Sequence, residues 1–482
     1  MRPLSGNRPS LPPSRADLLV AGSRDTSYAA ALASLHARAG ELHPTPGQPR
    51  RKFRLEEMRA LAESLGHPER RFRSVLVAGT NGKGSTSATL ASILRSAGYR
   101  CGLYTSPHLS RVNERIQIDG QAIADDDFAR LFFRVDDSAN RLLDHGHLPG
   151  PPSFFETLTA LALEAFAEAR VDLAVLEVGM GGRLDATNIV EPLLSVITDI
   201  SLDHTEWLGD TIALIAREKA GILRRRGTLV TLPQHPDANQ TIGEVAAELD
   251  VRGINAAQYM PSRDIESLQP SPAGRNCYPL QVVGEGIEVD SPLGGEHQRR
   301  NLALAIASAV ELSHSHGYHI TPAHIADGIR ATSWPGRLER LTFPDRADVL
   351  LDVAHNPAGA WALRAAISRL NADHPASPRV LVFGCMKDKA WQEMARILFP
   401  LFDLVVATPV DSPRSASAAD LVAAAANTGV RAIAARSGLE ALARAWAEAP
   451  QNGLVVVAGS MYLVGEVRPR LLATEPAAVA LR

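Results

Sequence analysis

The segment AGTNGKGST, residues 78–86, limits the fold of this chain more than any other. An apolar run at residues 75–77 predicts a buried strand before it, and apolar residues at helical spacing from Leu90 to Ala97 predict a helix after it. Strand, glycine loop and helix form the context of a phosphate-binding loop, because the backbone N–H groups and the helix N-terminus favour phosphate oxygens. The segment therefore predicts a phosphate site in an α/β fold.

Two side chains of this loop add chemistry to the backbone. Lys83 can bridge terminal phosphates, and the hydroxyl of Ser85 can hold magnesium. The strict P-loop pattern is not met, because Val77 stands at its first glycine position and Gly84 follows the lysine in place of Ser or Thr. A tight strand-to-helix turn without a ligand is therefore the alternative. The predicted phosphate-binding residues are Gly79, Thr80, Asn81, Gly82, Lys83, Gly84 and Ser85.

Apolar, β-branched runs alternate with helical patterns along nearly the whole chain, which favours parallel sheets covered by helices on both faces. The expected strands are residues 74–78, 173–178, 193–198, 349–353, 380–383, 404–407 and 454–458. A chain of 482 residues exceeds the roughly 250–300 at which single cores tend to split, so two domains are expected. We place their boundary at 331/332, beside Trp334-Pro335-Gly336, with residues 27–331 before it and 332–482 after it.

Residues 1–26 are expected to form a loose leader, because they hold four prolines but no apolar run that suits a signal peptide or a spanning helix. A formal charge of −3 gives no signature of a nucleic-acid or membrane partner, so small molecules are the expected partners. Cys101, Cys277 and Cys385 are an odd number without CxxC spacing, which fits a reducing cytoplasm.

Three residues outside the loop are candidates for metal or phosphate chemistry. Glu177 ends an apolar strand at the sheet edge where the loop also opens, and a carboxylate there suits magnesium or serves as a structural hydrogen-bond partner. His204 lies in a turn after the next strand, where a solvated histidine is the common alternative. Lys219 lies in a helix expected from Asp210 to Gly221, and alone it fits a solvated cation.

The loop AGTNGKGST resembles the P-loop of the Mur ligase superfamily, and its GKGS form is similar to the folylpolyglutamate synthase branch. Further segments match that family in the same order along the chain. They are YTSPHLSRVNERI, LEVGMGGRLDATN, TDISLDHTEWLG, IAREKAGI, EHQRRN, WPGRLE, LDVAHNP and AGSMYLVGE. The resemblance covers residues from about 28 to 468, and it implies an N-terminal P-loop ATPase-like domain with a mostly parallel sheet and a smaller C-terminal Rossmann-like α/β domain.

The resemblance also implies two magnesium ions, with ATP as co-substrate, and it leaves room for a potassium ion. One magnesium would lie between the ATP phosphates, Ser85 and Glu177, and the other would be held by Ser106, Glu177 and His204. Lys219 of the EKAGI motif is the candidate for a carbamoylated lysine.

In the family, residues that follow the P-loop further along the chain complete the ATP site. Here their counterparts are Asn301, Arg337, Asp352 and His355, although Val353 stands where the family usually has glycine. Arg337 offers a fork of donors for phosphate oxygens, and Asp352 ends a strand at the ligand-binding edge. An ion pair between domains is the alternative for these two charges.

Two further segments match family positions that contact the pterin-bearing substrate. They are Ser153, Phe154, Phe155 and Glu156, and Leu184, Asp185 and Ala186. Aromatic faces suit a flat pterin, and a carboxylate can accept its N–H groups. Unaided, Phe154 and Phe155 would be assigned to the core, because they open a helical run at residues 157–167.

The resemblance implies a cytoplasmic ligase, in which ATP activates a carboxylate of dihydropteroate or of a reduced folate and the enzyme joins it to L-glutamate. The family's common habit is the monomer. A muramyl-type ligase of cell-wall synthesis, a P-loop ATPase without ligation and an idle binding homologue are the alternatives. The sequence leaves open whether one or both folate activities are present.

Overall fold

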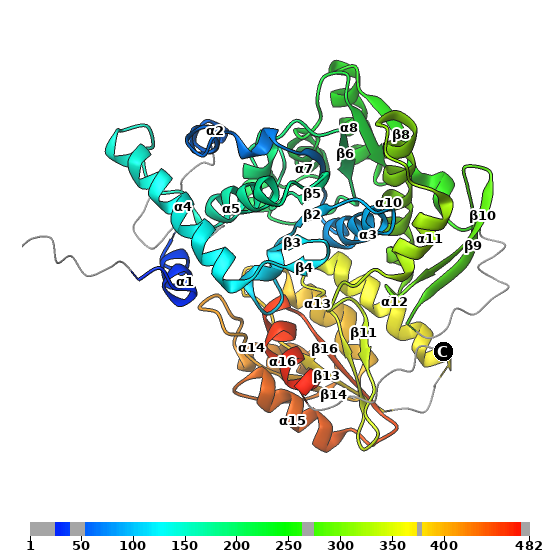
Figure 1. Ribbon diagram of the computed structural model, residues 1–482. Coiled ribbons are helices and arrows are strands. Elements are labelled where there is room, and N and C mark those ends of the chain that lie inside the picture. Colours follow the sequence, from blue (N-terminus) through cyan, green and yellow to red (C-terminus); the bar gives the residue numbers. More distant parts are fainter. Residues whose placement is uncertain (1–24, 39–53, 263–273, 374–377, 474–482) are drawn as a thin grey trace, which may run out of the picture.

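The computed structural model describes residues 25–38, 54–262, 274–373 and 378–473. Within them the chain is an α/β protein built on two large sheets, which confirms the expected fold class (Figure 1). Of the expected leader, residues 1–24 lie outside the described residues.

The first sheet has eight strands in the order β4-β3-β2-β5-β1-β6-β7-β8. Strands β2, β5, β1, β6, β7 and β8 are parallel, and β3 and β4 add an antiparallel edge. The strands are β1 (Arg73–Ala78), β2 (Cys101–Tyr104), β3 (Ile116–Ile118), β4 (Gln121–Ala122), β5 (Leu173–Glu177), β6 (Leu194–Ile197), β7 (Thr228–Thr231) and β8 (Arg252–Asn255). Because β1 lies between β5 and β6, the loops that follow these three strands open at one edge of the sheet.

Helices cover both faces of this sheet, as its apolar strands require. Val75 and Val77 pack in the core on one face, and Leu76 and Ala78 in the core on the other. The first face carries α3 (Lys83–Ser96), α10 (Glu296–Ser315) and α11 (Pro322–Arg330). The second carries α1 (Tyr28–His36), α2 (Leu55–Ser64), α4 (Asp125–Asp144), α5 (Phe154–Ala169), α7 (Ile212–Ala220) and α8 (Pro236–Glu248).

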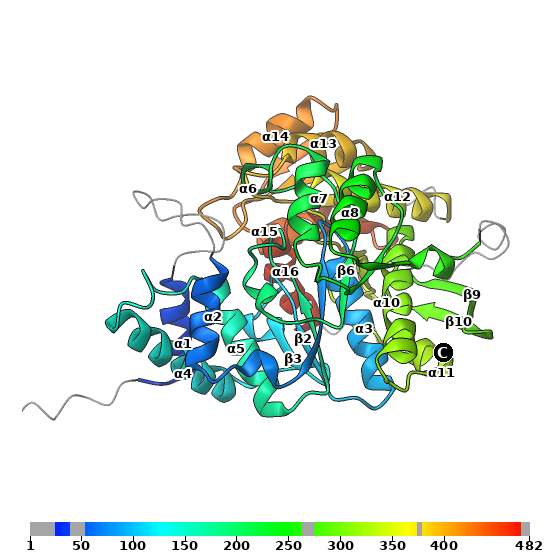
Figure 2. The ribbon, with the colours of Figure 1, turned by 90° about the horizontal axis from the view of Figure 1, so that it is seen from above.

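Shorter elements complete this half of the molecule. The hairpin of β9 (Asn276–Val282) and β10 (Glu285–Ser291) lies at the end opposite to α1, α2 and α4 (Figure 2). The remaining elements are η1 (Pro68–Arg70), η2 (Val112–Arg115), η3 (Ala186–Ile189), η4 (Ala256–Tyr259) and α6 (Thr205–Leu208).

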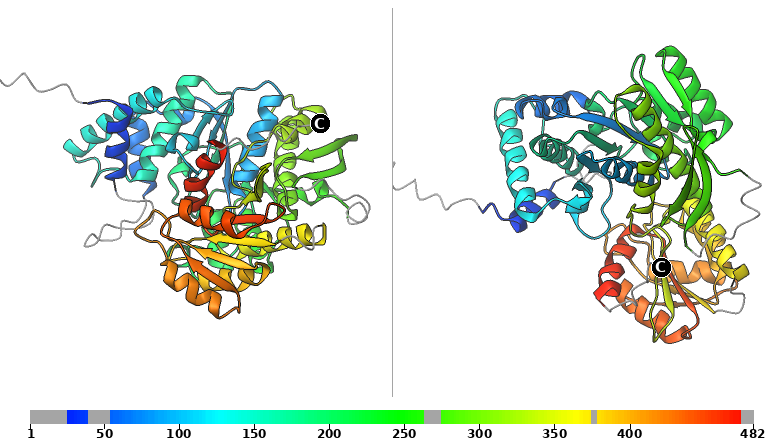
Figure 3. Two further views of the ribbon diagram at one scale, coloured as in Figure 1. Left: turned by 90° about the horizontal axis from the view of Figure 1, so that it is seen from below. Right: turned by 45° about the vertical axis from the view of Figure 1, so that its right-hand side comes forward.

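The second sheet has six strands in the order β11-β12-β16-β13-β14-β15, and all but β11 are parallel. They are β11 (Glu339–Leu341), β12 (Asp348–Leu351), β13 (Arg379–Phe383), β14 (Leu404–Ala407), β15 (Arg431–Ala434) and β16 (Leu454–Ala458). The helices are α12 (Pro357–Asp373), α13 (Trp391–Leu398), α14 (Ala418–Ala426), α15 (Gly438–Glu448) and α16 (Met461–Ala473), with η5 (Phe399–Leu401) after α13. Figure 3 shows this half below the first one in its right-hand view.

The expected boundary at 331/332 falls between α11 and β11, so the two sheets lie on either side of it, and the division into domains there stays a prediction. Helix α10 begins at Glu296, and its first turn carries polar residues that give no apolar helical period. Strands β2, β3, β4, β7, β8, β11 and β15 lie outside the expected strand ranges. Of these, β11 and β15 are short and partly charged, so their sequences give no apolar run. No helix within the described residues is long and apolar enough to cross a membrane.

Candidate functional site

A cavity of about 1370 Å³ opens where the carboxyl ends of the central strands of both sheets meet. Loops after β1, β5 and β6 line it from the first half, and loops after β12, β13 and β16 line it from the second. Every residue predicted to contact ATP or magnesium lines this cavity. The two halves therefore build one site together.

The loop after β1 has the shape expected of a phosphate-binding loop. Its amides at Thr80 and Asn81 donate to the carbonyl oxygen of Asp199, at 2.8 and 3.2 Å, which fixes the loop against the end of β6. Helix α3 starts directly after Gly82, whose φ of 89° is in the left-handed region. Lys83 Nζ folds back onto the carbonyl oxygen of Gly79 at 3.1 Å. The ammonium group thus lies over the mouth of the loop.

The departure from the strict P-loop pattern at Gly84 has a steric cause. A Cβ atom on Gly84 would lie 2.7 Å from Cζ2 of Trp334, so this helix start has no room for Ser or Thr. Sequence reasoning used Trp334 only as a boundary marker. In the fold it covers the first turn of α3.

The four candidate metal ligands, Ser85, Ser106, Glu177 and His204, all line the cavity. Glu177 is buried at the end of β5, where its Oε2 accepts a 3.3 Å hydrogen bond from the backbone N–H of Ser106. Burial raises the pKa of Glu177 to about 7, although the charge of Lys83 opposes this shift. Burial lowers the pKa of His204 to about 4, which keeps its imidazole neutral.

Lys219 is not the solvated cation that its sequence context suggested. It is 4% exposed, and its Nζ donates a 2.7 Å hydrogen bond to the carbonyl oxygen of Gly79. Burial, together with the neighbouring charge of Lys83, lowers the pKa of Lys219 to about 7. A large fraction of this amine is therefore neutral at physiological pH.

The predicted nucleotide contacts from later in the chain converge on the same loop. The side-chain oxygen of Asn301 approaches Gly82 so closely that a Cβ atom there would clash with it. Asp352 accepts backbone N–H groups from Leu338 at 3.0 Å and Ala354 at 2.9 Å. These bonds hold the turn that carries Arg337, so Asp352 shapes the site in addition to lining it. His355 Nδ1 lies 2.9 Å from the carbonyl oxygen of Val353.

A polar network that sequence reasoning missed joins the two halves. Lys389 Nζ donates to Oδ1 of Asp203 at 2.7 Å, across the cavity from β13 to β6. Asn356 donates from Nδ2 to Oδ2 of Asp203 at 3.1 Å and to Oδ1 of Asn81 at 3.0 Å. Asp203 and Asn356 lay within quoted motifs, whereas Lys389 had no local signal at all.

The predicted pterin contacts divide into two groups. Phe154, Phe155, Leu184, Asp185 and Ala186 line the cavity. Ser153 and Glu156 do not, because their side chains form the capping box of α5: Ser153 Oγ accepts the Glu156 N–H at 3.3 Å, and Glu156 Oε2 accepts the Ser153 N–H at 2.7 Å. Their direct contact with a substrate stays a prediction. The S-x-x-E spacing was the signal that could have revealed the cap.

Phe154 and Phe155 form an aromatic wall of the cavity, and two residues that were not predicted pack against Phe154. The His36 ring stacks on Phe154 at 6.2 Å between centroids, and the guanidinium of Arg115 lies 5.1 Å over the same ring. Both residues line the cavity. A flat ring with positive charge beside it suits an aromatic ligand that carries carboxylates.

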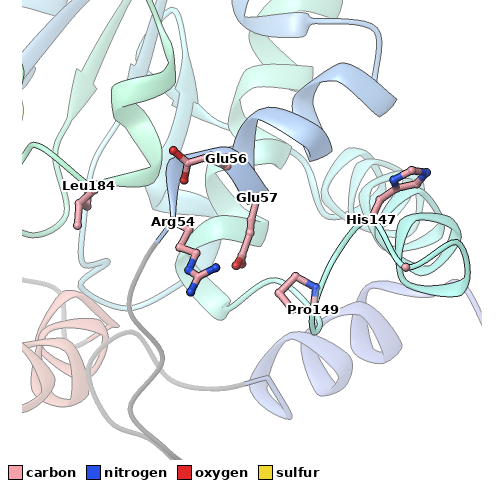
Figure 4. A pocket seen from close by; sticks show the side chains of 7 residues that line it. Arg54, Glu56, Glu57, His147, Pro149 and Leu184 are labelled. Atoms are coloured by element: carbon pink, nitrogen blue, oxygen red, sulfur yellow. The ribbon is translucent and has the colours of Figure 1, made fainter.

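A second, smaller cavity of about 600 Å³ is shown in Figure 4. Its lining includes Arg54, Glu56, Glu57 and His147. Leu184 lines both cavities, so it lies on the partition between them. The Asp185 side chain is buried, and its carboxylate accepts the N–H groups of Met180 and Thr187, each at 3.0 Å. Both carboxylate oxygens therefore already have backbone partners.

Comparison with known proteins gives a consistent set of similarities. Residues 153–309 match the Mur ligase middle domain, and residues 336–461 match the glutamate ligase domain of Mur ligases. A dihydrofolate synthase/folylpolyglutamate synthase of Bacillus subtilis is 34% identical over 463 residues, covering 92% of this chain and 99% of the relative.

Solved structures are similar over the same span. The folylpolyglutamate synthase of Mycobacterium tuberculosis, complexed with ADP and AMPPCP, superposes with a TM-score of 0.78 at 33% identity and covers 88% of this chain and 96% of its own. E. coli FolC in complex with DHPP and ADP gives a TM-score of 0.76 at 30% identity, with 93% and 98% covered.

Proposed function

The chain belongs to the Mur ligase family, in its branch of dihydrofolate and folylpolyglutamate synthases, and on this premise we propose how its site performs ligation. The chain is an acid–amino-acid ligase that joins glutamate to dihydropteroate or to folates. The single observation that carries the proposed mechanism is the convergence of the phosphate loop, Glu177 and Arg337 on one cavity with an aromatic wall. It also favours a folate acceptor over a muramyl precursor.

ATP occupies the phosphate-loop end of the cavity. The amides at the start of α3, which take no part in the bonds to Asp199, hold its phosphates, and Lys83 and Arg337 add positive charge to the γ-phosphoryl group from the two halves. Relatives with solved complexes bind ADP and AMPPCP. Asn301, next to Gly82, is placed to contact the nucleotide from α10.

The donors present fit magnesium, which prefers oxygen ligands. The Ser85 hydroxyl is buried at the cavity and has no hydrogen bond within the described residues, and the Glu177 carboxylate accepts only one backbone N–H there. Ser85, Ser106, Glu177 and the neutral His204 would hold the ions. No group of three His, Cys, Asp or Glu side chains in the part of the chain that the structure describes forms a metal site by itself.

Bound magnesium would neutralise charge on the phosphates during transfer. The two-ion arrangement and the additional potassium ion stay predictions. Both predictions can be tested without turnover. The protein is dialysed against a chelator and titrated with magnesium or potassium, and its affinity for AMPPCP is measured at each step.

Lys219 fits the proposed carbamoylation. A neutral amine adds to carbon dioxide, forming an N–C bond and losing one proton, and the product is a carboxylate in place of a cation. The lowered pKa supplies the neutral amine, and the position beside Gly79 and Lys83 would pair the new anion with the loop. Two lysines at one carbonyl oxygen are otherwise a like-charge contact.

The reaction then runs in two displacements. A carboxylate oxygen of the acceptor attacks the γ-phosphorus, the bond to the bridging oxygen of ADP breaks, and an acyl phosphate forms. The amine of L-glutamate attacks the acyl carbon, phosphate leaves, and the amine proton passes to solvent or a nearby base. The closed arrangement held by Lys389, Asp203 and Asn356 would exclude water that hydrolyses the acyl phosphate.

The aromatic wall takes the acceptor. Phe154 and Phe155 offer ring faces to the pterin, and Leu184, Asp185 and Ala186 close the pocket around it. DHPP is the ligand of one solved relative, E. coli FolC. Action on both dihydropteroate and reduced folates, a monomeric state and a cytoplasmic location complete the proposal.

Isotope transfer tests this mechanism. The purified protein is supplied with ATP, magnesium, L-glutamate and dihydropteroate that carries ¹⁸O in its carboxylate. The expected result is one new amide for each phosphate released, with one ¹⁸O atom in that phosphate. Phosphate without amide would support an ATPase that does not ligate, and amide formed only on a nucleotide-linked muramyl acceptor would support the cell-wall alternative.

A further inference from the structure

Helix α16 contains a glycine and a proline four residues apart, Gly465 and Pro469. Proline lacks a backbone N–H, so it cannot donate to the carbonyl oxygen four residues earlier, which belongs to Gly465. That oxygen instead accepts a 3.4 Å hydrogen bond from Oγ of Ser110, a residue of the first half. The interruption of the helix is therefore matched by a partner from the other half of the molecule.

The absence of a side chain at Gly465 leaves room for the backbone of residues 109 and 110. A Cβ atom on Gly465 would clash with the backbone carbonyl oxygen of Leu109. The Leu109 side chain passes beyond this contact and packs against the core of the second half, beside Gly336 and Val464. Gly465, Pro469 and the adjoining surface of α16 form a notch that receives residues 109 and 110.

The loop held in this notch is residues 105–111, which carries a candidate ligand. At one end the N–H of Ser106 bonds to Glu177 at 3.3 Å. At the other end the Glu114 carboxylate accepts the N–H groups of Leu109 at 2.7 Å and Arg111 at 2.9 Å. The loop is thus held internally, and the notch fixes where it lies relative to the second half.

The same helix is also tied to the turn that carries Arg337. Arg468 forms a two-pronged ion pair with Glu339, at 2.8 Å from Nη2 to Oε1, and Oε2 of Glu339 accepts the N–H of Gly336 at 2.8 Å. One helix therefore contacts both the loop of Ser106 and the turn of Arg337.

We propose that the Gly465–Pro469 notch of α16 holds residues 105–111 and so sets the position of Ser106 relative to Arg337, which makes Gly465 a positioning residue for ligation. The inference rests on the proposed function, in which the first half supplies metal ligands and the second half supplies Arg337. A displacement of about 1 Å between reacting groups can cost on the order of a hundredfold in rate.

The test compares two glycine-to-alanine changes inside helices. Gly465→Ala adds a methyl group that clashes with Leu109, whereas Gly243→Ala in α8 meets nothing within 4 Å. For Gly465→Ala we expect a fall in kcat of about tenfold or more, unchanged AMPPCP affinity and faster hydrogen–deuterium exchange confined to a peptide over residues 105–115. For Gly243→Ala we expect wild-type kcat and exchange with a raised Tm, because alanine favours helix.

Unchanged exchange and kcat in Gly465→Ala would overturn the proposal. Faster exchange over the whole chain with a lowered Tm would also overturn it, since Gly465 would then serve general packing. If the wild-type protein formed no amide, the proposed function would fail, yet the exchange of residues 105–115 would still decide whether the notch holds the loop.

Discussion

The carbonyl oxygen of Gly79 accepts a 2.7 Å hydrogen bond from Lys219 and a 3.1 Å hydrogen bond from Lys83. Two amines thus meet at the first glycine of the phosphate loop, one from the loop itself and one from the buried face of α7. This contact places Lys219 at the nucleotide end of the cavity, beside the charge of Lys83.

The stability of the protein should depend on pH through Lys219. Burial, aided by Lys83, lowers its folded-state pKa to about 7, whereas an unfolded lysine titrates near 10.4. Between these values the unfolded chain binds the extra proton, so stability rises with pH, by at most about 1.4 kcal/mol per pH unit. In buffer freed of carbon dioxide, where Lys219 stays an amine, urea unfolding at pH 7, 8 and 9 should show this rise for wild type relative to Lys219→Met. Parallel curves would contradict the shift.

The Lys389–Asp203 pair should couple the two halves energetically. Its side chains are 16% and 9% exposed, so removal of either partner leaves a poorly hydrated charge. Lys389→Met and Asp203→Asn should each lower kcat/KM, and the double variant should lose less than their sum. A double-mutant cycle should give a coupling of about 0.5–3 kcal/mol. Full additivity would mean that the pair does not act as a unit.

The contact between Gly84 and Trp334 should control nucleotide binding. Gly84→Ala adds a Cβ atom 2.7 Å from Trp334, and overpacking of this kind costs about 1–3 kcal/mol. Calorimetry with AMPPCP should show weaker binding by Gly84→Ala, with recovery in Gly84→Ala/Trp334→Ala because the second change restores space. Wild-type affinity in the single variant would exclude the steric account.

Substitutions in the aromatic wall and in the cap of α5 should have different effects: the first should weaken acceptor binding, and the second should lower stability. Phe154→Ala removes a stacked ring, so the KM of the pterin acceptor should rise about two- to tenfold while that of ATP stays constant. Ser153→Ala should instead lower stability by about 1 kcal/mol through loss of the cap. A raised acceptor KM in Ser153→Ala, at constant stability, would assign Ser153 to the substrate site.

Local sequence was informative wherever a site residue ends a strand or starts a helix. The phosphate loop and Glu177 follow directly from apolar strands, and parallel strands bring their carboxyl ends to one edge. The S-x-x-E spacing of Ser153 and Glu156 indicates a helix cap from local sequence alone. The family resemblance instead assigned both residues to the substrate site.

Contacts between the halves could not be predicted from local pattern. Lys389 meets Asp203 across 186 positions of the chain, and Trp334 covers Gly84 only because the second half folds back on the first. The buried state of Lys219 is a similar case. In the sequence this lysine fits a solvated cation, and only the packing of α7 on the sheet turns its side chain inward.

The central claim is that this chain ligates glutamate to a folate-type acceptor. The most direct test is phosphate release by the purified protein with ATP, magnesium and L-glutamate, comparing dihydropteroate, tetrahydrofolate and no acceptor, with the amide product quantified. The account predicts release with both acceptors, one amide per phosphate, and none without glutamate or acceptor. Release that does not require glutamate, or that yields no amide, would contradict it.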